Sequence, residues 1–115
     1  MIASALALFV AAKHVAFLVL EMFLWEQPIG RKIFRQSAEK ARDSAALAKN
    51  QGLYNGFLAA GLVWGVWRGD AGVVGFFLGC VVVAGLFGGA TVSPRVTLVQ
   101  ALPAAIAAAA LAAGR

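Results

Sequence analysis

The chain of 115 residues is poor in the residue types that most metal sites and catalytic sites use. It holds one cysteine, Cys80, which excludes an internal disulfide and a cysteine-based metal cluster. His14 is the only histidine, so no two histidines stand at metal-ligand spacing. The sequence also lacks a glycine-rich phosphate loop and a nucleophilic serine elbow. We therefore expect no metal and no cofactor, and the absences argue against a metalloenzyme or a nucleotide-driven pump.

Charged residues are scarce as well. They make up 13% of the chain, against about 25% in a soluble domain, while 62% of the residues are hydrophobic and the mean hydropathy is +0.84. The formal net charge of +5 is no sign of nucleic-acid binding, because six of the ten basic residues lie in one segment, 31–49, between apolar stretches. This composition predicts a single integral membrane domain over residues 1–115, with membrane lipids as partners and no nucleic acid.

Four apolar stretches approach the ~20 residues that a helix needs to cross a bilayer. No alternating pattern of barrel strands occurs, and the first stretch lacks the positive start of a signal peptide, so we expect it to be retained. Short connections make consecutive helices antiparallel neighbours. The predicted fold is all-α, a membrane-embedded four-helix bundle with spans at about 2–25, 51–67, 71–90 and 96–113.

The segment 26–50 is the one sizeable part predicted outside the membrane. Residues 27–30 read as a turn, and Ser37 can cap a short amphipathic helix over about 38–49 between the first two membrane helices. That helix either lies on the membrane surface or runs straight into the second span. The basic residues of this loop, together with Arg95, place it in the cytoplasm by the positive-inside rule. Both termini are then expected outside.

The first span carries titratable residues, which is unusual for a membrane helix. Lys13, His14 and Glu21 all lie within it, although one charged side chain in hydrocarbon costs roughly 2.5–3.5 kcal/mol on insertion scales. Glu21, Asn55 and Gln100 each stand four residues from the cytoplasmic end of their spans, at a depth of about 6 Å. Three helices are therefore expected to bring polar side chains to one layer.

Other polar residues can join this layer. Gln51 and Tyr54 share a helical face with Asn55, and Thr97 stands three residues before Gln100. His14 lies about 10 Å deeper on nearly the same face as Glu21. We expect a polar pocket that opens toward the cytoplasm. The alternative is that these side chains only form hydrogen bonds between helices, worth about 0.6 kcal/mol each.

Two further features concern helix packing. The small-x-x-x-small patterns Gly61 to Gly65 and Gly75 to Gly79 permit close helix approach, either within the chain or in a homodimer. Pro103 removes one backbone hydrogen bond from the fourth span and predicts a kink beside Gln100.

Several stretches of the chain resemble a known family. They are His14, Glu21 to Trp25, Arg31 to Phe34, Asn50 to Leu62, and Phe77 to Cys80. The family is a group of small bacterial membrane proteins known as domain of unknown function 1304, and the resemblance covers almost the whole chain. It implies four membrane helices, a place in the bacterial cytoplasmic (inner) membrane and emphasis on His14, Glu21, Asn50, Gln51, Tyr54, Asn55 and Gln100. It implies no activity, and the alanine-rich fourth span departs from the family pattern.

These observations leave two main functional hypotheses open. The first is small-molecule binding or proton-coupled transport, with Glu21 as the protonatable residue and with Tyr54 and Trp25 offering aromatic faces to a cation. The second is a cofactor-independent membrane enzyme, an isomerase or hydrolase, in which His14 and Glu21 act as acid and base on a lipid-like substrate. In a third reading the basic segment 31–49 contacts anionic lipids or a partner. Whether the protein is an enzyme stays open at this point.

Overall fold

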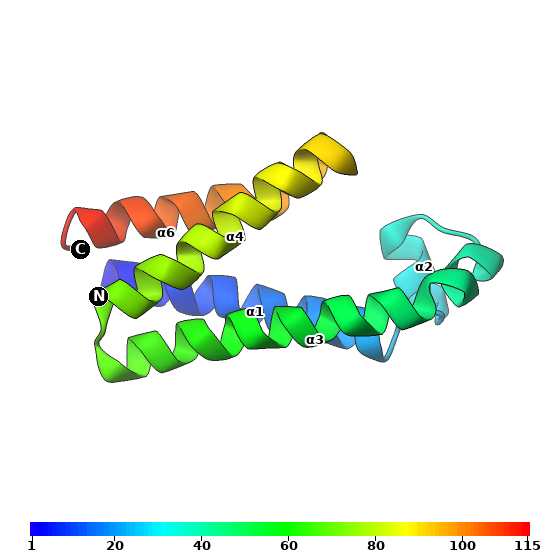
Figure 1. The fold of residues 1–115 in the computed structure, drawn as a ribbon, viewed down its shortest axis with the longest axis horizontal. Helices are drawn as coiled ribbons and strands as arrows, with labels where there is room; N and C mark the ends of the chain where they lie inside the picture. Colours follow the sequence, from blue (N-terminus) through cyan, green and yellow to red (C-terminus); the bar gives the residue numbers. More distant parts are fainter. The chain divides into compact units, whose positions relative to one another are not determined.

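A computed structural model describes residues 1–115, and the chain is entirely helical. It contains no strand, as the sequence predicts. In chain order the elements are α1 (Ile2–Met22), α2 (Pro28–Phe34), α3 (Ala38–Arg68), α4 (Ala71–Thr91), α5 (Pro94–Val96), a π-helical turn η1 (Thr97–Ala101) and α6 (Leu102–Ala112) (Figure 1).

The chain divides into two compact units. One comprises Met1–Ala12 with Leu58–Arg115, and the other comprises Lys13–Phe57. The helices α1 and α3 contribute residues to both units. The candidate carboxylate Glu21 and the basic segment belong to Lys13–Phe57, whereas α4 and the α5–α6 segment belong to the other unit.

Three helical segments are long and apolar enough to cross a membrane. They are α1 with 21 residues, α4 with 21 residues and the continuous segment Pro94–Ala112 with 19 residues. The bounds agree with three of the four predicted spans to within a few residues. The helix α3 is longer but less apolar, because its first part, residues 38–50, carries most of its charged residues. The predicted span that follows also opens with Gln51, Tyr54 and Asn55.

The segment between the first two spans differs in part from the sequence prediction. The turn expected at residues 27–30 is wrong, since Pro28 is the first residue of α2. Proline suits this position because its fixed φ is helical and its missing N–H would have no partner there. The helix expected from Ala38 is the first part of α3, so it continues without a break into the second predicted span, which is one of its two predicted forms. Its start is capped as predicted: the Ser37 Oγ accepts a hydrogen bond from the Lys40 backbone N–H at 3.1 Å.

The unit that contains α4 has a core of small and branched side chains. It draws on α1, α3, α4 and α6 through Val10, Leu62, Leu78, Val81 and Ala104. The helices approach closely at glycines: a Cβ at Gly85 would lie 2.6 Å from the Ala101 backbone nitrogen, and one at Gly65 would lie 2.8 Å from a Val74 methyl carbon. The pattern Gly61 to Gly65 therefore serves packing within the chain.

The connection from α3 to α4 is a tight turn. Gly69 has a φ of 64°, in the left-handed region that glycine adopts without strain. The carboxylate of Asp70 then accepts hydrogen bonds from the backbone N–H groups of Gly72 and Val73, at 3.0 and 3.2 Å. Two consecutive residues thus reverse the chain and begin α4.

At the place where Pro103 predicts a kink beside Gln100, the structure has the π-helical turn η1, which ends two residues before Pro103. A π-helical turn is one of the ways in which a helix accommodates a missing backbone donor. The Thr97 Oγ1 within the turn donates a hydrogen bond to the Gly85 carbonyl oxygen of α4 at 2.9 Å. Thr97, expected in the polar layer, therefore links η1 to α4.

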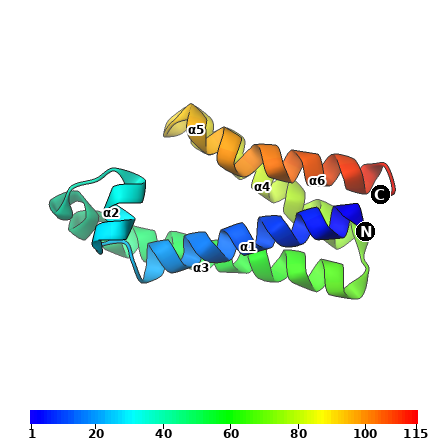
Figure 2. The same cartoon turned by 180° about the vertical axis from the view of Figure 1, so that it is seen from behind.

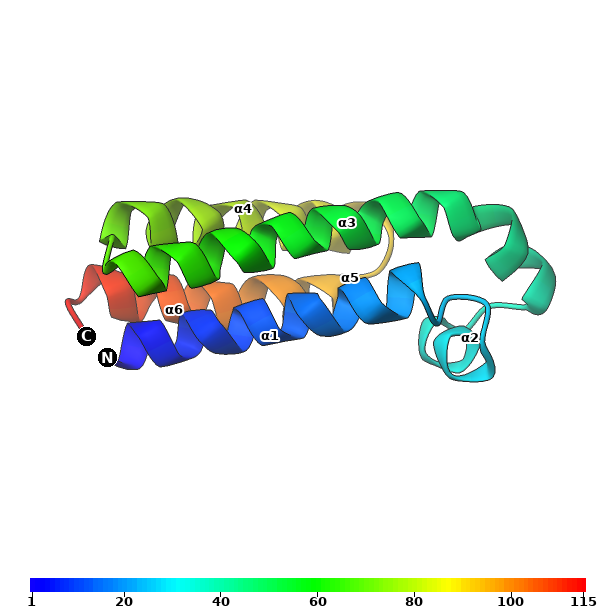
Figure 3. The ribbon, with the colours of Figure 1, turned by 90° about the horizontal axis from the view of Figure 1, so that it is seen from below.

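The two ends of the chain meet. The amino group of Met1 donates a hydrogen bond to the Arg115 carbonyl oxygen at 2.7 Å, and the Ile2 N–H donates to the same oxygen at 2.8 Å. Both termini lie side by side at one end of α1 and α6 when the molecule is seen from behind (Figure 2) and from below (Figure 3).

Candidate functional site

The central contact in the unit Lys13–Phe57 joins α1 to α3 through two polar side chains. The Nδ2 of Asn55 donates a hydrogen bond to the Oε1 of Glu21. Glu21 stands in the last turn of α1, and both side chains are half-buried. The structure thus brings together two of the residues that the sequence places in one layer.

Two glycines of α3 make this contact possible. A Cβ at Gly52 would lie 2.5 Å from the Met22 Cγ and 3.2 Å from the Glu21 Cβ, and one at Gly56 would lie 2.8 Å from a Leu18 methyl carbon. Gly52 and Gly56 stand one turn apart on α3, in a small-x-x-x-small pattern. Because neither carries a side chain, α3 lies close enough for the short amide of Asn55 to reach the carboxyl group.

The end of α1 near Glu21 is held in place by the segment that follows. The Trp25 indole N–H donates a hydrogen bond to the Ser44 Oγ of α3 at 3.0 Å. The Trp25 ring also packs against Phe34 of α2, with 4.7 Å between ring centroids. Trp25, which was expected to offer an aromatic face to a cation, thus contacts α2 and α3 of its own chain.

Gln51 and Tyr54 lie beside Asn55 in sequence but occupy the exposed surface of α3. Tyr54 is 57% exposed and packs edge-on against Phe57, with 5.5 Å between ring centroids. Asn50, which the family resemblance emphasises, is exposed as well. Of the polar residues on this part of α3, Asn55 is the one that reaches Glu21.

His14 lies on α1, two turns before Glu21, and is 1% exposed. Its ring packs edge-on against Phe17, with 5.9 Å between centroids and 79° between the ring planes. Lys13, the preceding residue, is half-buried. At ~1.5 Å per residue, the position of His14 along the helix is about 10 Å from that of Glu21.

Gln100 belongs to the other compact unit, where it is half-buried within η1. It is the one predicted site residue outside Lys13–Phe57. The set that the structure places in one unit is therefore His14, Glu21, Gln51, Tyr54 and Asn55.

The Glu21–Asn55 pair can form a hydrogen bond in both protonation states of the carboxyl group. An ionised carboxylate only accepts, and the amide N–H₂ donates to it; a protonated carboxyl donates, and the amide oxygen can accept. Asn55 therefore accommodates a change of charge on Glu21 by turning its amide. No three His, Cys, Asp or Glu side chains lie close enough together to hold a metal ion.

Comparison with known proteins identifies the family. The model of the family described as "Protein of unknown function (DUF1304)" matches residues 8–112, a range that includes every predicted site residue. The chain belongs to the DUF1304 family. A relative in Lactococcus lactis subsp. lactis (strain IL1403), named "Uncharacterized protein YpaA", is 28% identical over 99 residues, which are 83% of each chain. No solved structure matches.

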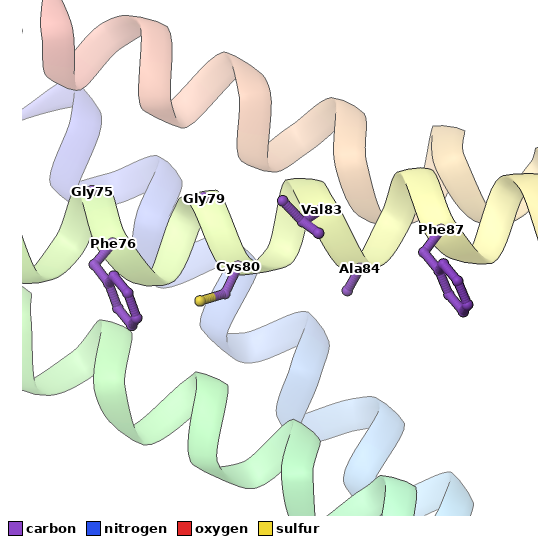
Figure 4. A pocket seen from close by; sticks show the side chains of 7 residues that line it. All are labelled: Gly75, Phe76, Gly79, Cys80, Val83, Ala84 and Phe87. Atoms are coloured by element: carbon purple, nitrogen blue, oxygen red, sulfur yellow. The ribbon is translucent and has the colours of Figure 1, made fainter.

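This DUF1304 protein also has a hollow on one face of α4, with a volume of about 720 Å³. All its lining residues belong to α4, and Phe76, Cys80 and Phe87 point to the same side of the helix (Figure 4). The lining is apolar except for the Cys80 thiol. A Cβ at Gly79 within it would meet nothing within 4 Å, so the second glycine of the Gly75 to Gly79 pattern has no packing partner within the chain.

Two features of the Glu21 site were not predicted from the sequence. The pattern Gly52 to Gly56 is as visible in the sequence as the two glycine patterns noted there, and it marks the closest approach of α3 to Glu21. The hydrogen bond between Trp25 and Ser44 has no such signal, since it depends on how the segment 23–37 folds.

Proposed function

We propose that this DUF1304 protein is an integral membrane protein of four crossing helices that binds a small cationic molecule at Glu21 in exchange for a proton. The cytoplasmic membrane of a bacterium is its proposed location, with both termini outside. The site comprises Glu21 and Asn55, with His14 deeper on the same helix.

The meeting of the chain ends supports four crossings. Three helical segments can cross a membrane by length and composition, and three crossings would leave the termini on opposite sides. The Met1 amino group and the Arg115 carbonyl are hydrogen-bonded, and this contact supports an even number of crossings. We propose that the remaining long helix, α3, is the fourth. Its basic first part, 38–49, stays on the cytoplasmic side in agreement with the positive-inside rule.

The observation that carries the functional proposal is the hydrogen bond from Asn55 to the half-buried Glu21. A bond that only held two helices together would be served equally well by glutamine, which inserts into a membrane at lower cost than a carboxylate. A carboxyl group is needed instead where the charge of the residue changes during function, and the Asn55 amide can form a hydrogen bond with both charge states. Glu21 near the end of an apolar helix is such a residue.

The exchange consists of one proton for one positive charge. In the resting state Glu21 is protonated and hydrogen-bonded to Asn55. An arriving cation is held by the carboxylate as the O–H bond of Glu21 breaks, and the proton passes to water. The exposed ring of Tyr54, one residue before Asn55, offers a face for cation–π contact. Release of the cation restores the protonated state.

The test uses the purified full chain in liposomes or detergent. Proton release is recorded with a pH-sensitive dye as tetraphenylphosphonium, other lipophilic cations and neutral apolar compounds are added. Wild type is expected to release protons with at least one cation, and Glu21→Gln is expected to release none. Glu26→Gln is the matched control, because Glu26 is exposed five residues farther along the chain. Release by a folded Glu21→Gln protein would refute the proposal.

The buried position of His14 in the same unit favours a second candidate, a membrane enzyme with His14 and Glu21 as acid and base. The two candidates differ in what they require of His14. Proton exchange needs mainly the carboxylate, so a folded His14→Gln protein should still release protons with cations. An acid–base enzyme loses its activity in both variants. The enzyme would be favoured by two results together. The folded protein releases no protons with any compound, and it transforms a lipid-like substrate only when both His14 and Glu21 are intact.

A further inference from the structure

The short helix α2 has one face that packs against the rest of its unit. Gly30 is buried, and a Cβ at this position would collide with the carbonyl oxygen of Leu24. One turn later, Phe34 packs against the Trp25 ring. This face of α2 is therefore fixed to the chain that leaves α1.

A neighbouring, exposed part of the α2 surface is both apolar and basic. Ile29 and Ile33 stand one turn apart and are 54% and 51% exposed. Lys32 and Arg35, both exposed, stand next to them, whereas Arg31 is half-buried and its Nε is buried. No acidic residue occurs from residue 27 to residue 38. Exposed isoleucines beside a cluster of one charge sign are typical of a helix that lies in the headgroup region of a membrane.

Arg35 supplies a separate observation. It ends α2 with φ 53° and ψ 51°, in the left-handed region. The Gln36 N–H bonds back to the Arg31 carbonyl oxygen at 3.0 Å, a helix ending that usually places glycine at this position. An arginine there is strained, because a residue with a Cβ crowds its own backbone in this conformation. The basic cluster thus includes an arginine at a position where the backbone conformation favours glycine.

We propose that α2 binds anionic phospholipid headgroups at the cytoplasmic surface. Ile29 and Ile33 enter the boundary between headgroups and acyl chains, and the exposed Lys32 and Arg35 bind the lipid phosphates. The occupant is a lipid surface because the face combines exposed hydrocarbon with positive charge, which complements an anionic leaflet. The inference rests on the proposed membrane insertion of α1 but not on proton exchange at Glu21.

The first test measures lipid preference. The full chain is reconstituted with phosphatidylcholine and phosphatidylglycerol, and the ratio of the two lipids retained after solubilisation is measured by mass spectrometry. Each basic residue removed near an anionic surface weakens binding about fivefold. The double variant Lys32→Gln/Arg35→Gly should therefore lose about 25-fold in preference for phosphatidylglycerol. Arg35→Gly also relieves the strained backbone, so this variant should remain folded.

The matched control is Lys40→Gln/Arg42→Gln, which removes two exposed basic residues from α3. Its preference for phosphatidylglycerol should change less than twofold. Equal losses of lipid preference in the two double variants would overturn the inference. The preference would then depend on the total charge of the segment and not on α2. An unchanged preference in both would overturn it as well.

The second test places a spin label at residue 33 in vesicles that contain no other protein. In a Cys80→Ser background, the label at Ile33→Cys should be more accessible to oxygen than to a nickel chelate. The label at the exposed Glu39→Cys should be more accessible to the nickel chelate than to oxygen. Equal access of the nickel chelate to both would overturn the inference. A label at Phe9→Cys on α1 reports whether α1 is inserted in the membrane. If this label is not more accessible to oxygen than to the nickel chelate, both the lipid-binding inference and the proposed membrane function are overturned.

Discussion

Replacing Gly52 with alanine tests whether the approach of α3 to α1 depends on the missing side chain. The added Cβ would lie 2.5 Å from the Met22 Cγ, 3.2 Å from the Glu21 Cβ and 3.3 Å from the Leu18 carbonyl oxygen. The Met22 side chain can rotate away, but the other two atoms are fixed to the backbone of α1. The helices must therefore separate by a few tenths of an ångström around Glu21.

Two opposing terms set the change in the free energy of unfolding. Overpacking costs about 1–3 kcal/mol, whereas alanine in place of a helical glycine stabilises by roughly 0.5–1 kcal/mol. Gly79→Ala in α4 isolates the second term, because its Cβ meets nothing within 4 Å. Gly52→Ala should accordingly be less stable than Gly79→Ala by about 1–3 kcal/mol.

The assay is reversible unfolding in mixed detergent micelles, followed by circular dichroism. A second measurement addresses the hydrogen bond itself: Asn55→Ala should destabilise the Gly52→Ala protein less than it destabilises wild type, because the separation has already weakened the bond to Glu21. Equal stabilities of Gly52→Ala and Gly79→Ala, together with an unchanged cost of Asn55→Ala, would refute the reasoning.

Two further predictions concern single hydrogen bonds. Thr97→Val removes the bond to the Gly85 carbonyl and should lower stability by about 0.6 kcal/mol without changing proton release; an effect on proton release alone would contradict its packing role. Trp25→Phe and Ser44→Ala should each cost about 0.5–1.5 kcal/mol. The cost of the double variant should be less than the two single costs together, because both remove the same bond. Strict additivity in a double-mutant cycle would show that the Trp25–Ser44 bond does not form.

The bounds of the apolar helices could be predicted from the sequence because they depend on local properties. The first span lacks proline and glycine throughout, and the cap residues Ser37 and Asp70 accept hydrogen bonds from the backbone a few residues later. Such contacts are settled within one helical turn. The error at Pro28 arose at this same level, since proline suits both a turn and the first residue of a helix.

The candidate site could be predicted only in part. Depth along a helix follows from residue counting, and it placed Glu21 and Asn55 in one layer. Rotation about the helix axis does not follow from counting, and it leaves Gln51 and Tyr54 exposed while Asn55 reaches Glu21. The rotation of α3 is set by where its backbone can approach α1, and Gly52 and Gly56 decide that.

The sequence by itself determined an all-helical chain, the approximate bounds of three of its four predicted spans, the titratable residues within the first span and the basic segment that follows it. These properties follow from composition and from periodicity along one helix. Only the tertiary structure decided that Asn55 bonds to Glu21, that Thr97 bonds to Gly85, and that Met1 meets Arg115. The partners in these contacts stand 34, 12 and 114 residues apart. Contacts of this range depend on packing between helices, which no local pattern specifies.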